Sequence, residues 1–121
     1  MDLKSKLTLL SRLRAHIGRR VTIEAQDFAS EAGLLQAVGR KFIKVMGQFF
    51  VPSTLQKITL LDIPTNLLTT PVSIRSTYRG TFSAGLVNIG ADYIEIIENQ
   101  EGTRRRLLIP LNKVISIEIT S

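Results

Sequence analysis

The first eighteen residues show the spacing of apolar side chains that is typical of an amphipathic helix. Asp2 is a candidate N-cap, and Gly18 is a natural stop directly after a last turn that carries His16. The apolar positions recur at intervals of three and four: Leu3, Leu7, Leu10, Leu13 and Ile17. This pattern predicts a helix whose apolar stripe packs on the rest of the protein and whose outer face is basic. The alternative, a helix at a membrane surface, lacks an aromatic anchor on the apolar face.

After Gly18 the helical period ends and alternation typical of β-strands begins. The first half predicts strands at RVTIEA (20–25), GLLQAV (33–38), FIKVM (42–46), FFVP (49–52) and KITLL (57–61). The second half predicts strands at SIRSTY (73–78), TFSAGLVNI (81–89), YIEIIE (93–98), RRRLLIP (104–110) and VISIEI (114–119). Between them, residues 63–71 contain Pro64 and Pro71 and are predicted to form a linker.

The two halves share a pattern, which indicates an internal repeat. When VGRKFIKVM (38–46) and IGADYIEII (89–97) are aligned on Gly39 and Gly90, Phe42 falls on Tyr93. Further matches are the aliphatic-Pro steps Val51-Pro52 and Ile109-Pro110, and the segments LQKI (55–58) and LNKV (111–114). The alternative is that short β-meanders share glycine turns and alternating aliphatic residues without a common origin.

A helix followed by five short, strongly bent strands resembles the Sm-like small β-barrel. FSAGLVNIGADYIEII (82–97) is similar to the bent second and third strands of that family, with Gly85 relieving crowding where the strand curls. RRRLLIPLNKVISIEI (104–119) is similar to the fourth strand, short turn and fifth strand of Hfq-type and eukaryotic Sm proteins. The same residues resemble a family of short uncharacterised proteins of spore-forming Firmicutes, some of them labelled spore-coat-associated. The resemblance is close over residues 72–119 and looser over 13–61.

We therefore expect a mostly β protein in which an N-terminal α-helix precedes two Sm-like five-stranded antiparallel small barrels. The helix and the first repeat would occupy residues 1–62, the linker 63–71 and the second repeat 72–121. The resemblance supports RNA binding less than it supports the fold. Sm proteins hold RNA with an Asp and an Asn between strands two and three, and neither GRKF (39–42) nor GADY (90–93) contains an Asn. Their Arg/Lys-Gly pair before the last strand is also absent, and Asn112-Lys113 matches half of the Lys-His pair of Hfq-type proteins.

Composition limits the class of protein. The chain has 121 residues, of which 44% are hydrophobic and 21% charged, as in a globular domain. It contains no Cys, which excludes disulfides and thiolate chemistry. No apolar run is long enough to span a bilayer, so we expect no integral membrane association. The N-terminus lacks the pattern of a signal peptide, which predicts a cytoplasmic location, with the spore coat as the alternative that the resemblance implies.

The net charge of +6 is concentrated at the N-terminus, where six basic residues stand against Asp2 within the first twenty positions. Such a cluster indicates a phosphate-rich or otherwise anionic partner. The candidate contacts are Lys4, Lys6, Arg12, Arg14, Arg19 and Arg20 in the first segment, Arg40 and Lys41 in the GRK turn, and Arg104 and Arg106 in the RRR run. For the RRR run the preferred interpretation is protection of an edge strand together with pairing to nearby carboxylates, and an anionic partner is the alternative.

Residues typical of catalysis are sparse. His16 is the only histidine and is predicted to be a capping or surface residue; with no Cys, a metal site is not expected. Glu95 and Glu98 are predicted to be exposed and to form cross-strand ion pairs with the arginines 104–106. We expect no cofactor, and we expect that the protein is not an enzyme. Most aromatic residues are predicted to lie in the core, and one of the adjacent rings Phe49 and Phe50 is either covered by the second repeat or exposed for a partner.

These observations predict a non-enzymatic scaffold or assembly protein that forms homo-oligomers through strand edges, with a link to sporulation implied by the resemblance. The strands at the ends of such small barrels have unpaired edges, and an internal repeat would pair one edge within the chain and leave two for further assembly. The alternative function is a module that binds RNA or another nucleic acid through the basic N-terminal helix. A different protein is also considered as a partner.

Overall fold

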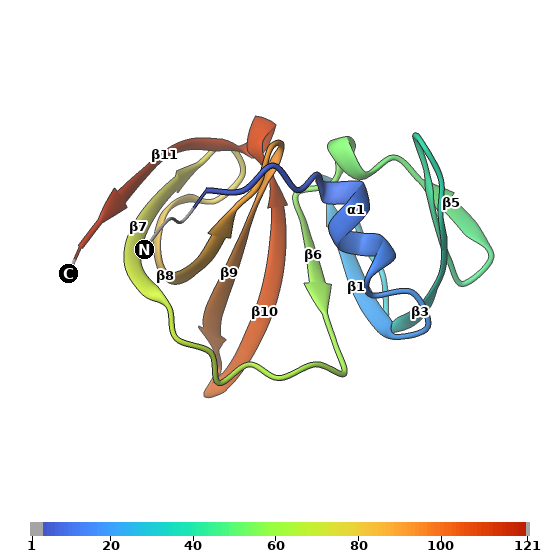
Figure 1. Ribbon diagram of the computed structural model, residues 1–121, viewed down its shortest axis with the longest axis horizontal. Helices are drawn as coiled ribbons and strands as arrows, with labels where there is room; N and C mark the ends of the chain where they lie inside the picture. Colours follow the sequence, from blue (N-terminus) through green and yellow to red (C-terminus); the bar gives the residue numbers. More distant parts are fainter. Residues whose placement is uncertain (1–3, 121) are drawn as a thin grey trace.

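The computed structural model describes residues 4–120 and shows a mostly β protein with one short α-helix (Figure 1). In chain order the elements are α1 (Leu9–Arg14), β1 (Arg20–Ala25), β2 (Phe28–Ala29), β3 (Gly33–Val38), β4 (Ile43–Val45), β5 (Gln48–Phe50), the 3-10 turn η1 (Pro52–Thr54), β6 (Lys57–Leu60), β7 (Thr70–Ser76), β8 (Gly80–Ile89), β9 (Tyr93–Gln100), β10 (Thr103–Pro110), the 3-10 turn η2 (Leu111–Lys113) and β11 (Val114–Ile119). Each predicted strand has a counterpart, and β2 is additional. The connection between β6 and β7 contains no helix or strand.

Within residues 4–120 the strands form one antiparallel sheet of eleven strands that does not close on itself. Its order is β11-β7-β8-β9-β10-β6-β1-β3-β4-β5, with β2 paired to β1 beside this path. Figure 1 shows the second half of the chain curling on the left and the first half on the right, with β6 and β10 side by side between them. The mostly β prediction is confirmed, whereas a division into two small barrels stays a prediction.

The helix is much shorter than the sequence pattern predicts. It begins at Leu9, where Thr8 is the N-cap and its hydroxyl oxygen accepts a hydrogen bond from the Ser11 N–H at 3.1 Å. The preceding segment is held outside the helix because the Ser5 N–H donates to the Ile89 carbonyl at 2.8 Å. The predicted N-cap Asp2 lies outside the described residues.

The predicted apolar stripe of the helix is only partly right. Leu13 is fully buried, but Leu7 and Ile17 are exposed, because neither lies within the short helix. Leu9, which the predicted stripe omits, is buried instead. The face that packs on the sheet is therefore set by Leu9 and Leu13, one helical turn apart.

The two halves have the same strand order and the same register. The first half runs β6-β1-β3-β4-β5 and the second runs β11-β7-β8-β9-β10. From β1 to β4, each residue of the first half has its equivalent 51 positions later in the second half: Val21 pairs with Gly33 as Val72 pairs with Ala84, and Leu35 pairs with Val45 as Leu86 pairs with Ile96. The β3–β4 and β8–β9 pairs also have a register shift at equivalent places, after Leu35 and after Leu86. The alignment predicted on Gly39 and Gly90 is therefore matched by strand pairing.

The turns correspond as well. The Gly39 N–H donates to the Phe42 carbonyl at 2.7 Å, and the Gly90 N–H donates to the Tyr93 carbonyl at 2.8 Å. The β4–β5 hairpin closes through Met46-Gly47 and the β9–β10 hairpin through Glu101-Gly102. All four of these residues have positive φ angles, between 49° and 81°, which is the requirement of a type I′ turn.

Beyond this hairpin the spacing changes to 59 residues, because β9 and β10 are longer than β4 and β5. Ile23 pairs with Ile58 as Ile74 pairs with Ile117, so Ile58 and Ile117 are equivalent. The predicted match of LQKI with LNKV is consequently wrong by three residues. Leu55, the C-cap residue directly after η1, corresponds to Val114, the C-cap residue directly after η2.

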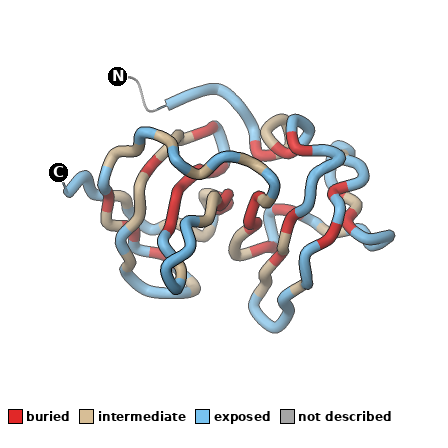
Figure 2. Tube along the Cα trace, turned by 90° about the horizontal axis from the view of Figure 1, so that it is seen from below, coloured by how far each residue is buried: buried red, intermediate tan, exposed pale blue. Residues whose placement is uncertain are grey.

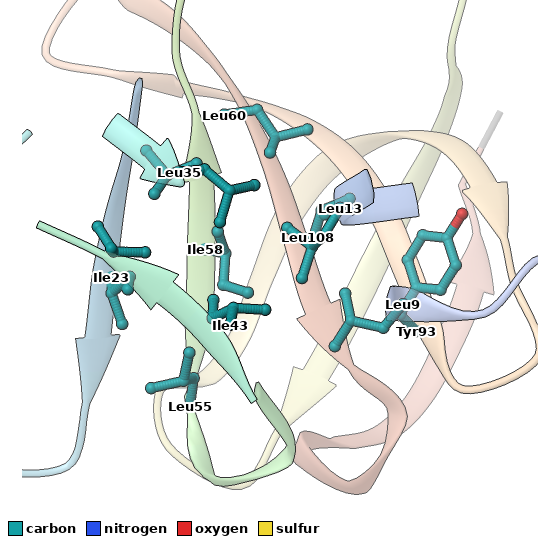
Figure 3. Packing of buried hydrophobic residues seen from close by; sticks show 12 residues of the cluster. Leu9, Leu13, Ile23, Leu35, Ile43, Leu55, Ile58, Leu60, Tyr93 and Leu108 are labelled. Atoms are coloured by element: carbon teal, nitrogen blue, oxygen red, sulfur yellow. The ribbon is translucent and has the colours of Figure 1, made fainter. Parts of the chain in front are cut away.

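Buried side chains form two apolar clusters. One lies within the second half and includes Ile74, Leu86, Ile96 and Leu107. The other belongs to the first half but also takes Leu9 and Leu13 from α1 and Tyr93 and Leu108 from the second half, as Figure 3 shows. In Figure 2 most buried positions lie along the strands of both halves, and exposed positions are concentrated in the connections between them. The first half therefore completes its core with residues from outside itself.

Candidate functional site

The seam between the two halves shows what the sheet edges can bind. In the seam, Leu108 of β10 lies opposite Ile58 of β6, and Arg106 lies opposite Leu60. Leu108 and Ile58 are fully buried there, and Leu60 is 2% exposed. The β10 strand is the fourth strand of its half and β6 is the fifth strand of its own, so the seam is a contact between a fourth and a fifth strand.

The same two strand types end the sheet without a neighbour. Among residues 4–120, β5 pairs only with β4 and β11 pairs only with β7. Since Ile43 pairs with Phe50 as Ile94 pairs with Ile109, Phe49 is the equivalent of Leu108. Phe49 is 67% exposed where Leu108 is buried. Likewise Ile119 is 59% exposed, although its equivalent Leu60 is buried. Side chains that the seam covers are thus uncovered at the two free edges.

The predicted basic contacts do not form one surface. Arg12 and Arg106 meet at Glu95: Arg12 Nε donates to Glu95 Oε1 at 2.7 Å, and Arg106 Nε donates to Glu95 Oε2 at 2.5 Å. The two arginine side chains are only 14% and 17% exposed. Their charge is therefore satisfied inside the protein, where it joins α1 to β9 and β10.

The other predicted contacts are distributed over the surface. Arg20 pairs with Asp62 at 2.7 Å, which holds the pKa of that carboxyl at about 2, chiefly through the hydrogen bond that the Arg20 side chain donates. Arg104 is exposed on β10, far along the chain from the helix. Lys4, Lys6 and Arg19 are also exposed.

Three of the predicted basic contacts belong to the turn between β3 and β4 or reach it. Arg40 and Lys41 lie in this turn, and Arg14 Nη2 donates to its Gly39 carbonyl at 3.3 Å. A largely apolar pocket of about 470 Å³ lies there, lined by Arg40, Lys41 and Phe42 together with Pro52, Pro110 and Asn112. Asn112 Nδ2 donates to the Ser53 carbonyl at 3.0 Å, so η1 and η2 are tied together at this pocket.

Several predictions about polar side chains are wrong. His16 is fully buried rather than at the surface, with Nε2 3.0 Å from the Arg20 carbonyl oxygen. Burial lowers the pKa of His16, and the nearby charges of Arg12 and Arg19 lower it further. Glu95 and Glu98 are buried, because β9 is an inner strand of the sheet. Glu95 pairs with Arg106 as predicted, but Glu98 pairs with Arg79.

Phe28 and Phe42 depart from the predicted core placement, since they are 43% and 46% exposed, whereas Phe49, at 67% exposed, is the uncovered member of the adjacent pair Phe49-Phe50. Phe42 and Phe49 are in contact edge to face, with ring centroids 6.4 Å apart, and Lys44 Nζ lies 5.6 Å from the Phe49 centroid. The adjacency of Phe49 and Phe50 in the sequence indicated that one of the two rings would be on the outer face, because neighbouring residues of a strand point to opposite faces.

Asp92 has a role that sequence reasoning missed. Its Oδ1 accepts a hydrogen bond from the Leu9 N–H at 2.7 Å, so the turn between β8 and β9 holds the start of α1. No local pattern indicates this contact, because 83 residues separate the two partners.

Within the described part of the chain there is no group of three or more His, Cys, Asp or Glu side chains that could hold a metal ion. The described residues contain one α-helix, which is six residues long. No helix in this part of the chain is long and apolar enough to cross a membrane. Comparison of the chain with protein-family models, with curated proteins and with solved structures finds no match.

Proposed function

We propose that this chain is a non-enzymatic assembly protein, built from two Sm-like units in tandem, whose copies join through β5 of one molecule and β11 of the next. The observation that carries the proposal is the contrast between equivalent residues: Leu108 is buried in the internal seam, whereas Phe49 is 67% exposed on β5. The resemblance to small-barrel proteins and the equal strand order of the halves support the tandem arrangement.

The free edges are complementary in type. The fourth strand of one half pairs with the fifth strand of the other inside the chain, and the two unpaired edges are again a fourth strand, β5, and a fifth strand, β11. Pairing them would satisfy backbone hydrogen-bonding groups and cover Phe49 and Ile119, which a monomer leaves in water. Such a contact joins different surfaces of identical copies, so it produces a ring when the rotation closes and a filament when it does not.

The test is the oligomeric state of purified protein by size-exclusion chromatography with light scattering. We expect the wild type to be larger than a monomer at high concentration, and Phe49→Glu to be a monomer, because a charge would be buried at the contact. Leu68→Glu is the matched control, since Leu68 is 94% exposed in the β6–β7 connection and belongs to neither edge strand. A wild type that stays monomeric at all concentrations, or an effect of Leu68→Glu equal to that of Phe49→Glu, would contradict the proposal.

The second candidate is nucleic-acid binding, which is favoured by Arg40 and Lys41 lining an apolar pocket together with Phe42, while Arg14 bonds to Gly39 in the same turn. Basic side chains next to an exposed aromatic ring are the combination used to hold single strands. Fluorescence anisotropy with a labelled single-stranded RNA should then show binding that weakens steeply with salt. Changing Arg40 and Lys41 to Gln should abolish it, whereas Arg104→Gln should leave it nearly unchanged. Flat titrations of the wild type at low salt would exclude this function. The link to sporulation rests on the resemblance alone.

A further inference from the structure

The second of the two equivalent glycine turns is covered by a segment from the start of the chain. In this turn, which joins β8 to β9, the Ala91 N–H donates to the Leu7 carbonyl at 2.8 Å. Asp92 Oδ1 accepts a hydrogen bond from the Leu9 N–H at 2.7 Å. Both bonds use backbone groups of the covering segment. The turn therefore binds a peptide segment through main-chain hydrogen bonds, which is a common way for proteins to recognise peptides.

The equivalent turn of the first half, residues 39–42 between β3 and β4, has no such cover. Phe42 is 46% exposed, whereas its equivalent Tyr93 is fully buried. Gly39 is exposed, whereas its equivalent Gly90 is buried. The two turns have the same internal hydrogen bond, so the difference in burial comes from what lies over them. A surface that is occupied in the second half is thus open in the first.

The two turns carry opposite charges. The second turn contains Asp92, and the segment that covers it, KSKLTL (4–9), is basic. The first turn has Arg40 and Lys41 at the positions of Ala91 and Asp92. Neither Arg40 nor Lys41 makes a hydrogen bond or ion pair with another residue in the described range 4–120. Because complementary charges select the partner, a segment that covers the first turn should be acidic.

The first turn also has a place for an apolar side chain. At the second turn, Leu9 of the covering segment belongs to the same buried cluster as Tyr93 (Figure 3). At the first turn, Phe42 lines the largely apolar pocket of about 470 Å³, together with Arg40 and Lys41. An apolar side chain that enters this pocket would pack on Phe42 and remove both surfaces from water.

We propose that the turn at residues 39–42 binds an acidic, extended peptide of another protein, as the turn at residues 90–93 binds the start of this chain. A carbonyl of the peptide accepts from the Arg40 N–H, its carboxylates pair with the Arg40 and Lys41 side chains, and an apolar residue enters the pocket. A peptide is favoured over a nucleic acid because the equivalent turn already binds a peptide segment. The proposal does not depend on edge-to-edge assembly, since the turn belongs to neither β5 nor β11.

The test uses the full chain and two hexapeptides with blocked ends, derived from the covering segment. One is KSKLTL itself, and the other is ESELTL, in which glutamate replaces both lysines. Saturation-transfer NMR observed on the peptide measures weak binding whatever the size of the protein assembly. We expect ESELTL to bind and KSKLTL to bind at least about fivefold more weakly, because two exposed charge pairs become repulsive.

The double variant Arg40→Ala/Lys41→Asp gives the first turn the residues that the second turn has at these positions. It should lose ESELTL and bind KSKLTL instead. Arg75→Ala/Arg104→Asp is the matched control, because it changes the net charge equally at two exposed positions of β7 and β10 that do not line the pocket. It should keep the wild-type preference for ESELTL. Both double variants change exposed side chains, so both should keep the wild-type urea midpoint, which separates lost binding from lost folding.

Three results with the peptides would overturn the proposal: no binding of ESELTL, equal binding of the two peptides, or wild-type binding of ESELTL by Arg40→Ala/Lys41→Asp. A single-stranded oligouridylate supplies the last comparison. If the oligouridylate binds the wild type, fails to bind the Arg40 and Lys41 variant and is not displaced by ESELTL, the turn is a nucleic-acid site and the proposal is overturned as well.

Discussion

At the scale of single residues, Glu95 is the charge that joins the helix to the sheet. It is 2% exposed and accepts hydrogen bonds from both Arg12 and Arg106. A buried carboxylate is tolerated only when it is paired, and here two guanidinium groups share the pairing. The excess of positive charge in the first twenty residues is thus partly used for folding rather than for binding a partner.

Replacing Glu95 by Gln should destabilise the protein strongly. Two largely buried arginines would lose the one carboxylate that they pair with among the described residues, which typically costs about 3–5 kcal/mol. Urea unfolding would measure this as a lower midpoint with an unchanged slope. Glu31→Gln, at an exposed position, is the control and should change the midpoint little. Equal midpoints for the two variants would show that the Glu95 network does not contribute to stability.

The buried His16 should make stability depend on pH. Its pKa is lowered in the folded state, mainly by burial, so the unfolded chain binds the proton more readily than the folded chain. Stability should therefore be complete above the unfolded pKa of about 6.5 and should fall as the pH drops below it, by at most about 1.4 kcal/mol per pH unit.

Urea midpoints at pH 7.5 and 5.5 check this prediction. The wild type should lose more stability between the two pH values than His16→Gln, which has no proton to gain. Asp62, the carboxylate whose charge acts on the His16 pKa, is present in both proteins. The same loss in both proteins would mean that another group titrates.

At the scale of elements, the equivalent glycine turns of the two halves differ in how closely other residues pack against them. In the second half a Cβ at Gly90 would overlap the Tyr93 ring and would lie 2.7 Å from the Leu7 carbonyl oxygen. In the first half a Cβ at Gly39 would meet only the Phe42 carbonyl oxygen, at 3.4 Å. The difference arises because the N-terminal segment crosses the second turn, where the Ala91 N–H donates to the Leu7 carbonyl at 2.8 Å.

Gly90→Ala should consequently destabilise the protein by about 1–3 kcal/mol, since the added methyl group forces the Tyr93 ring or the N-terminal segment to move. Gly39→Ala is the matched control and should cost clearly less. Thermal unfolding of the two variants side by side gives the comparison. If Gly39→Ala proved as costly as Gly90→Ala, backbone conformation rather than the crossing segment would be the reason for both glycines.

At the scale of the whole molecule, the internal seam predicts the register between copies. Leu107 lies opposite Thr59 in the seam, and their equivalents at the free edges are Gln48 and Glu118. Because the chain contains no Cys, single Cys variants can report this contact without background. Gln48 and Glu118 are both exposed, so neither change should disturb the fold.

A mixture of Gln48→Cys and Glu118→Cys should form a disulfide-linked dimer under mild oxidation, visible on a non-reducing gel. A mixture of Gln48→Cys with Leu68→Cys should form far less disulfide-linked dimer. Efficient linking of Gln48→Cys to itself would indicate that two β5 edges meet, and would contradict the head-to-tail register.

Much of the fold could be predicted from the sequence because strands and tight turns are local. Alternating residues indicate the strands, and Gly39 and Gly90 mark equivalent turns 51 residues apart. The pattern could not give the start of the helix, since Leu7 belongs to a helical stripe but its carbonyl bonds to Ala91. Nor could it separate the candidate contacts, because Arg12 and Arg14 are alike in sequence and only one of them reaches Glu95.

The sequence by itself determined the β-rich architecture, the repeated order of strands and the location of the positive charge. The tertiary structure alone decided that β6 and β10 pair, that His16, Glu95 and Glu98 are buried, and that Phe49 is uncovered while Leu108 is not. The physical reason is that periodicity places a side chain on one face of a strand, whereas burial depends on which distant segment lies against that face.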